Sequence, residues 1–281
     1  MKQVIFIIIL ICVFVFSACG KTDKSSTITS QILGSSNSSN SSSSSSSTGK
    51  RSEVGTELST FMSNYLDAKT KLWDNMSKNL ETEGNTQYLM GLLGFAIADM
   101  TIIEIPMYDT LLTGTNGMFK GKLMFSGIDA WKKVNGNTIE FGYDFTYDNE
   151  KNENKKGDHQ VATGKFDIKD QSLTYENYTE RNNEKINRYV VEIVANSDKS
   201  YSSQTLTDGS DNKLSGYFTW FDGTNIISSM AEKDKTDSNY KYSSILSKKN
   251  MKPEDMSVGL VVKLKASYLN GKATFESLEG N

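Results

Sequence analysis

From residue 118 onward, apolar and polar residues alternate, and this alternation constrains the fold more than any other feature of the chain. In the clearest run, 139–147, the aromatic residues Phe141, Tyr143 and Phe145 alternate with Gly142 and Asp144. A period of two predicts a half-buried β-strand, because successive side chains point to opposite faces of a sheet. Similar runs predict further strands at 118–127, 161–169, 173–180, 186–195, 213–221, 225–231, 260–269 and 272–278.

The connections between these runs are short and polar, and their length indicates how the strands pair. Asn270-Gly271 is the strongest signal, since Asn-Gly between two strands favours a tight hairpin turn. Most of the other connections are too short to hold the helix that a parallel crossover needs. We therefore expect an antiparallel sheet.

Helical patterns precede the strands. Apolar residues recur at steps of three and four over 58–76, which predicts an amphipathic helix that ends near Gly84-Asn85. Residues 88–105 are apolar on nearly all sides and predict a buried helix, with a surface lying on lipid or on a partner as the alternative. Residues 240–251 predict a short helix before Pro253.

These patterns together predict an α+β fold that is mostly β. We expect the amphipathic helix and the buried apolar helix to pack on a long, curved antiparallel sheet. Residues 51–281 suffice for one substantial core, so they are expected to form a single globular domain.

The N-terminus carries an apolar run, 4–16, after Lys2, and the run ends in Phe16-Ser17-Ala18-Cys19. This arrangement resembles a bacterial lipoprotein signal peptide with its lipobox, although the family usually has Leu, Val or Ile where Phe16 stands. The resemblance implies that residues 1–18 are removed and that Cys19 carries diacylglycerol and palmitate. It places the protein on the outer, extracytoplasmic face of the cell membrane. The alternatives are an uncleaved membrane helix, for which the run is short, and an ordinary secretory signal.

A Ser-rich segment follows the lipobox. Residues 25–48 are mainly Ser, with an unbroken run at 41–47. Such a segment has little apolar surface to bury, so residues 19–50 are expected to be a disordered tether that begins at the lipidated Cys19. Abundant Lys, Asn, Ser, Tyr and Ile with scarce Pro resembles the composition of Gram-positive, clostridial-type proteins.

Composition excludes several classes of chemistry. The chain has two cysteines, and removal of the signal peptide takes Cys12 and leaves Cys19, so no disulfide framework is expected. His159 is the single histidine, which excludes a zinc site rich in thiolate or histidine. We expect no metal and no cofactor. A net charge of −3 without a dense basic stretch argues against nucleic acid as a partner.

Few residues suggest catalysis. The polar stretch 208–212 offers oxygen ligands but lacks the spacing of a calcium loop, so we interpret it as a turn. His159 stands at the entrance of a strand, where a surface position is expected. A hydrolase would need two carboxylates across a cleft. The strand candidates are Asp144, Glu176, Glu180 and Glu192, and alternation assigns them to solvated faces.

Aromatic residues are the remaining candidates for a site. They lie at Phe141, Tyr143, Phe145 and Tyr147 on one strand, and at Tyr217, Phe218, Trp220 and Phe221 on another. These rings either pack in the core or line a cavity for an apolar or sugar ligand. For Trp220 in particular, core and binding surface both remain open.

A curved sheet over a helix beside a lipobox is loosely similar to the half-barrel carrier lipoproteins of the LolA and LppX type. The resemblance is architectural, covers 51–281, and implies a cavity between sheet and helix that holds acyl chains. We expect a non-enzymatic binding or carrier protein for an apolar or glycan ligand, anchored to the lipid bilayer through Cys19. The alternative is a structural or interaction module for an envelope protein or a cell-wall polymer.

Overall fold

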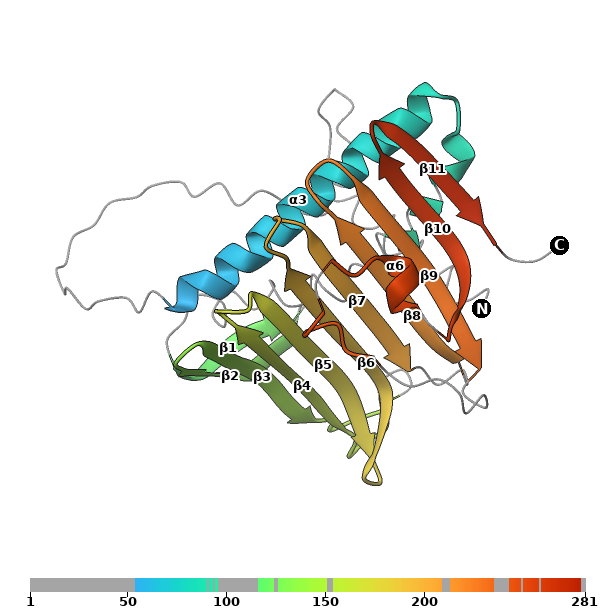
Figure 1. Ribbon diagram of the computed structural model, residues 1–281. Helices are drawn as coiled ribbons and strands as arrows, with labels where there is room; N and C mark the ends of the chain where they lie inside the picture. Colours follow the sequence, from blue (N-terminus) through green and yellow to red (C-terminus); the bar gives the residue numbers. More distant parts are fainter. Residues whose placement is uncertain are drawn as a thin grey trace, which may run out of the picture. The chain divides into compact units, whose positions relative to one another are not determined.

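The computed structural model describes residues 54–89, 91–92, 94–95, 116–123, 126–150, 154–208, 213–234, 243–248, 250–257 and 259–278 (Figure 1). All of them belong to the compact unit Asn40–Asn281. Their strands form one 11-stranded sheet whose order follows the chain from β1 to β11. Every neighbouring pair is antiparallel. The α+β, mostly β class with an antiparallel sheet is therefore confirmed.

The strand bounds agree well with the alternating runs. The strands are β1 Gly117–Leu123, β2 Ser126–Asn135, β3 Thr138–Thr146, β4 His159–Asp167, β5 Ser172–Arg181, β6 Glu184–Ala195, β7 Tyr201–Asp208, β8 Lys213–Phe221, β9 Ile226–Asp234, β10 Val261–Leu269 and β11 Lys272–Ser277. The Asn270-Gly271 hairpin between β10 and β11 forms as predicted, and both of its residues have positive φ.

One predicted strand was incorrect, and two strands, β2 and β7, were not predicted. A single strand over 118–127 is wrong, because β1 ends at Leu123, which pairs with Ser126 at the start of β2. Strand β7 was missed because its sequence is mainly Ser, Thr and Gln. Residues 202–206 of this strand are nevertheless buried, and the Gln204 amide finds a buried acceptor in Glu192 at 2.8 Å.

Helix α3, Val54–Thr82, is the predicted amphipathic helix. Figure 1 shows it behind the strands, across the face that we call the inner face. Its apolar stripe is buried against aromatic residues of the sheet: Phe61 lies 4.8 Å from Phe166 between ring centres, and Tyr65 lies 5.4 Å from Phe221. The helix ends as predicted near Gly84, whose φ of +76° a residue with a Cβ adopts only with strain.

The predicted buried helix over 88–105 lies mostly outside the described residues. Tyr88 ends a 3-10 turn, Thr86–Tyr88, and the described residues between Leu89 and Phe95 are helical, with Leu92 and Phe95 buried. The Phe95 ring stacks on Trp73 of α3 at 5.7 Å. Among the described helices, none is both long and apolar enough to cross a membrane.

The face opposite α3, the outer face, is partly covered by residues 243–248 and 250–257, which we call the outer segment. Ile245 and Met256 of this segment join Phe218 and other sheet residues in a second apolar cluster. The predicted helix over 240–251 is wrong for its described residues, which are not helical. Helix α6, Pro253–Met256, begins at the proline instead, because proline suits the first turn, where its missing N–H has no partner to lose.

Candidate functional site

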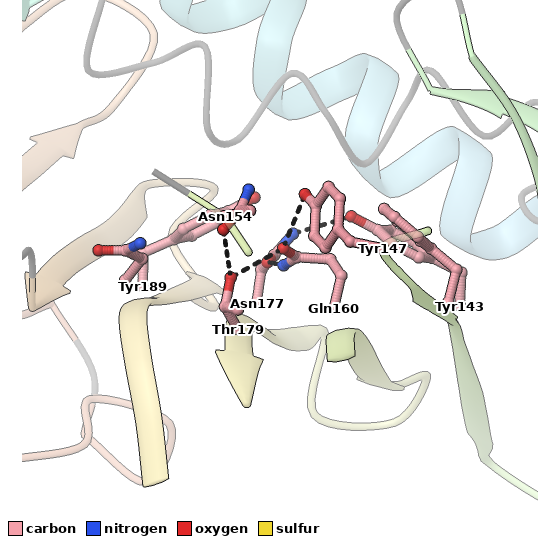
Figure 2. Close-up of a pocket in the computed structure, with 9 residues that line it drawn as sticks. Tyr143, Tyr147, Asn154, Gln160, Asn177, Thr179 and Tyr189 are labelled. Carbon is pink, nitrogen blue, oxygen red and sulfur yellow. Dashed lines mark hydrogen bonds between the residues drawn. The ribbon is translucent and has the colours of Figure 1, made fainter. Parts of the chain in front are cut away.

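A pocket of about 290 Å³ lies on the inner face of strands β3 to β6, near the loop that connects β3 to β4. Figure 2 shows how its side chains converge. The lining consists of Tyr143, Phe145, Tyr147, Asn154, Gln160, Asn177, Thr179, Asn187 and Tyr189. None of these nine side chains carries a formal charge at neutral pH.

One wall of the pocket is a row of aromatic rings on β3 and just beyond its end. Alternation places Tyr143, Phe145 and Tyr147 on the same face, with ring centres 6.1 Å and 5.0 Å apart along the row. Phe141, earlier on this strand, is buried in the core, and the rings become more exposed toward Tyr147. The row therefore serves as core at one end and as pocket wall at the other.

The floor of the pocket is a hydrogen-bonded network of amides and hydroxyls. The Gln160 Oε1 accepts hydrogen bonds from Thr179 Oγ1 at 3.0 Å and from Tyr147 OH at 3.5 Å. The Gln160 Nε2 donates to Asn177 Oδ1, and Asn177 Nδ2 donates to the hydroxyl of Tyr143 at 3.0 Å. Each amide is thereby fixed in one orientation, so the network presents a defined pattern of donors and acceptors.

An ion pair holds the loop that supplies Asn154. The Asp158 carboxylate, nearly buried, accepts two hydrogen bonds from the Arg181 guanidinium and one from the backbone N–H of Lys155 at 2.7 Å. These hydrogen bonds and the charge of Arg181 lower the pKa of Asp158 to about 2. This ion pair holds the loop against the end of β5. Asn154 Oδ1 of the loop lies 3.4 Å from Thr179 Oγ1 of that strand.

The same carboxylate influences Tyr147. Burial and the nearby negative charge of Asp158 raise the pKa of the Tyr147 phenol above its usual value. The hydroxyl is protonated at neutral pH, as an ordinary phenol is, and acts as a donor toward Gln160.

A β-bulge on β6 completes the site. The register of β5 and β6 shifts between Asn177 and Thr179, where β6 contains one more residue than β5. Asn187 lies in this bulge with a φ of +49° and reaches the pocket. Bulges commonly re-aim a side chain at the edge of a regular ladder.

This lining is suited to binding an uncharged polar molecule. Aromatic rings offer flat faces for C–H groups, whereas amides and hydroxyls exchange hydrogen bonds in fixed directions. Among the described residues there is no group of three His, Cys, Asp or Glu that could hold a metal ion.

The carboxylate candidates from the sequence lie away from the pocket. Asp144 is 60% exposed and contacts His159 at 3.3 Å, on the outer face. Glu176 binds Arg188 and Lys185 at 2.5 and 3.1 Å, and burial opposes but does not outweigh their lowering of its pKa.

The remaining candidates also lie elsewhere. Glu192 is buried beneath the outer segment. Glu180 lies opposite Lys185 in the register of the β5–β6 hairpin. Among the residues that the structure describes, neither carboxylate lines the pocket. Residues 209–212 of the polar stretch and Cys19 lie outside the described residues.

Trp220 lies on the outer face of β8, half-buried, with the Lys252 Nζ 5.3 Å from the centre of its ring. Its neighbours Tyr217 and Phe221 belong to the inner core, and Phe218 belongs to the outer cluster. Trp220 therefore lies at the margin of the outer segment and does not line the pocket.

The sequence placed the aromatic residues of β3 on one face, with core and cavity both open, and gave no prediction of the amide floor. The available signal was the change from apolar to amide residues along the inner positions of β4 and β5, for example from Tyr175 to Asn177. Asn187 gave no signal, because the bulge that directs it depends on the pairing of two strands.

Comparison of the chain with protein-family models, with curated proteins and with solved structures gives no significant match.

Proposed function

We propose that this protein is a non-enzymatic lipoprotein, anchored through Cys19, that binds an uncharged carbohydrate in the pocket on β3 to β6. The observation that carries the proposal is the composition of the lining. Aromatic rings form one wall, amides and hydroxyls form the floor, and no lining residue is charged.

Alternative ligands fit this lining less well. An acyl chain would offer no hydrogen bond to the polar floor around Gln160 and Asn177, so that part of the lining would contribute nothing to its recognition. A charged ligand would meet no opposite charge in the lining. A sugar offers apolar C–H faces to Tyr147 and Phe145 and hydroxyl groups to the amides, so it contacts both the aromatic wall and the polar floor.

The expected location agrees with such a ligand. A lipid anchor at Cys19 and a Ser-rich tether would hold the domain outside the membrane, where cell-wall and environmental glycans occur. Binding a cell-wall polymer is therefore one form of the same function. The carboxylates Asp144 and Glu176 on the outer face are engaged with basic residues, which favours binding over hydrolysis.

The test is calorimetric titration of the full-length protein in detergent with chitotriose, cellotriose and maltotriose. We expect saturable binding of at least one of these oligosaccharides. Tyr147→Ala should weaken that binding by at least about tenfold, because it removes a ring of the aromatic wall.

Tyr178→Ala is the matched control. This ring lies on the outer face of β5, with the Lys185 Nζ 4.0 Å from its centre, and its removal should leave affinity unchanged. Absence of binding to all three oligosaccharides, or equal binding by the Tyr147→Ala variant, would contradict the proposal.

A further inference from the structure

The bulge on β6 places one amide in the pocket in a different way from the others. Gln160 and Asn177 extend from regular strands, and their amides are engaged in the floor network. Asn187 instead occupies the bulge in the left-handed backbone region, with a φ of +49°. Its side chain lines the pocket and is half-buried.

The Asn187 side chain makes no hydrogen bond to any described residue, in contrast to the amides of the floor. An asparagine amide offers one acceptor oxygen and two N–H donors. A bound ligand would displace water from this partly buried amide, and both its oxygen and its nitrogen then need partners. A ligand that supplies them is favoured over one that leaves them unpaired.

We propose that Asn187 determines the specificity of the carbohydrate pocket, by pairing with a ligand group that offers a donor and an acceptor side by side. Two sugar groups have this chemistry: an acetamido substituent and a pair of neighbouring hydroxyls. The inference rests on the proposed function, and it assigns to Asn187 the choice among uncharged sugars.

A purely structural role for Asn187 is the competing explanation. Asparagine tolerates the left-handed region better than most residues, so the bulge alone could account for its presence. Glycine satisfies that backbone requirement equally well and has no amide. The substitution Asn187→Gly therefore separates the two roles, and Asn187→Asp keeps the size of the side chain while removing the N–H donors.

The experiment titrates full-length wild type, Asn187→Gly and Asn187→Asp with chitotriose, which carries acetamido groups, and with cellotriose, which carries neighbouring hydroxyls. The matched control is Asn183→Gly, an exposed residue with a φ of +64° in the turn of the same hairpin. We expect both Asn187 variants to lose about tenfold or more in affinity for the oligosaccharide that wild type prefers, and the control to lose none. The oligosaccharide affected identifies the group that Asn187 recognises.

The outcomes for the two proposals are distinct. If wild type binds neither oligosaccharide nor maltotriose, the proposed function fails. If wild type binds and both Asn187 variants bind equally well, the inference on Asn187 fails while the proposed function stands. Thermal unfolding of each variant shows whether a loss of binding reflects a loss of folding, and Asn187→Asp keeps the test decisive if the glycine variant is unstable.

Discussion

The carboxylate of Asp158 and the guanidinium of Arg181 form two hydrogen bonds, with Nε to Oδ1 at 2.8 Å and Nη2 to Oδ2 at 2.5 Å. Asp158 belongs to the end of the β3–β4 loop, and Arg181 is the last residue of β5. The Tyr147 N–H donates to the backbone oxygen of Asp158 at 2.9 Å, so this pair also fixes the end of the aromatic row. One ion pair thus connects three parts of the pocket lining.

We expect this ion pair to make stability depend on pH in the acid range. The folded-state pKa of Asp158, about 2, lies below the value of about 4 of an unfolded chain. Its contribution is therefore fully present above pH 4 and is lost as the pH falls from about 4 to about 2. Urea unfolding of wild type and of Asp158→Asn between pH 2 and 7 measures this contribution.

The difference between the two proteins should be largest near neutral pH and should vanish near pH 2. Lys213→Gln is the control, because it removes an ion pair with Glu232 on β8 and β9, far along the sheet order from β4 and β5. A pH-independent difference for Asp158→Asn would show that the ion pair is not its cause.

Much of the sheet could be predicted because local pattern and global fold agree. Runs such as 139–147 have one polar and one apolar face, and the corresponding strand β3 has that environment. Strand β7 could not be predicted in this way. Its polar residues between 202 and 205 are buried on both faces, by α3 on one side and by the outer segment on the other, and the sequence does not reveal this double cover.

The pocket was only half predictable for a related reason. The aromatic row follows from alternation within one strand, so Tyr143, Phe145 and Tyr147 could be assigned to one face. The floor arises from residues on three strands and a loop, and its hydrogen bonds depend on register. Asn187 depends on a register shift that no single strand encodes.

Substitution of Cys19 tests the lipid anchor. The proposed thioether at Cys19 is the attachment point, and each buried methylene of an acyl chain contributes about 0.8 kcal/mol of membrane affinity. We expect Cys19→Ala to remain an unprocessed precursor or to appear in the medium. Fractionation followed by immunoblotting measures this, with Cys12→Ala as a control that should remain in the membrane. A mature-sized Cys19→Ala protein in the membrane fraction would rule out the lipid anchor.

Substitution of Trp220 distinguishes packing from binding on the outer face. Its Nε1 is buried with no hydrogen-bond partner among the described residues, and Lys252 lies over the ring. Because the side chain is half-buried, Trp220→Ala should lower the free energy of unfolding by about 1–3 kcal/mol, less than for a fully buried aromatic. Oligosaccharide binding should be unchanged. Urea unfolding gives the free energy of unfolding, and calorimetric titration of the same preparation gives the affinity for oligosaccharide. Unchanged stability with weakened binding would place the ligand site on the outer face.

Substitution of Glu192 tests what holds the outer segment on the sheet. This carboxylate is 2% exposed and accepts hydrogen bonds from Gln204 Nε2, Ser244 Oγ and the Ile245 N–H, each at 2.8 Å. Glu192→Ala leaves these donors without their acceptor, so we expect a loss of at least about 2 kcal/mol in the free energy of unfolding.

The loss should be local at first. Hydrogen exchange at residues 243–248 should accelerate in Glu192→Ala before exchange in β3 to β6 changes, because this carboxylate accepts hydrogen bonds from Ser244 and Ile245 of the outer segment. Glu184→Ala, at an exposed position on the same strand, is the matched control and should change stability by less than about 0.5 kcal/mol. Unaltered exchange at 243–248 in Glu192→Ala would mean that the apolar contacts of Ile245 and Met256 hold the segment without Glu192.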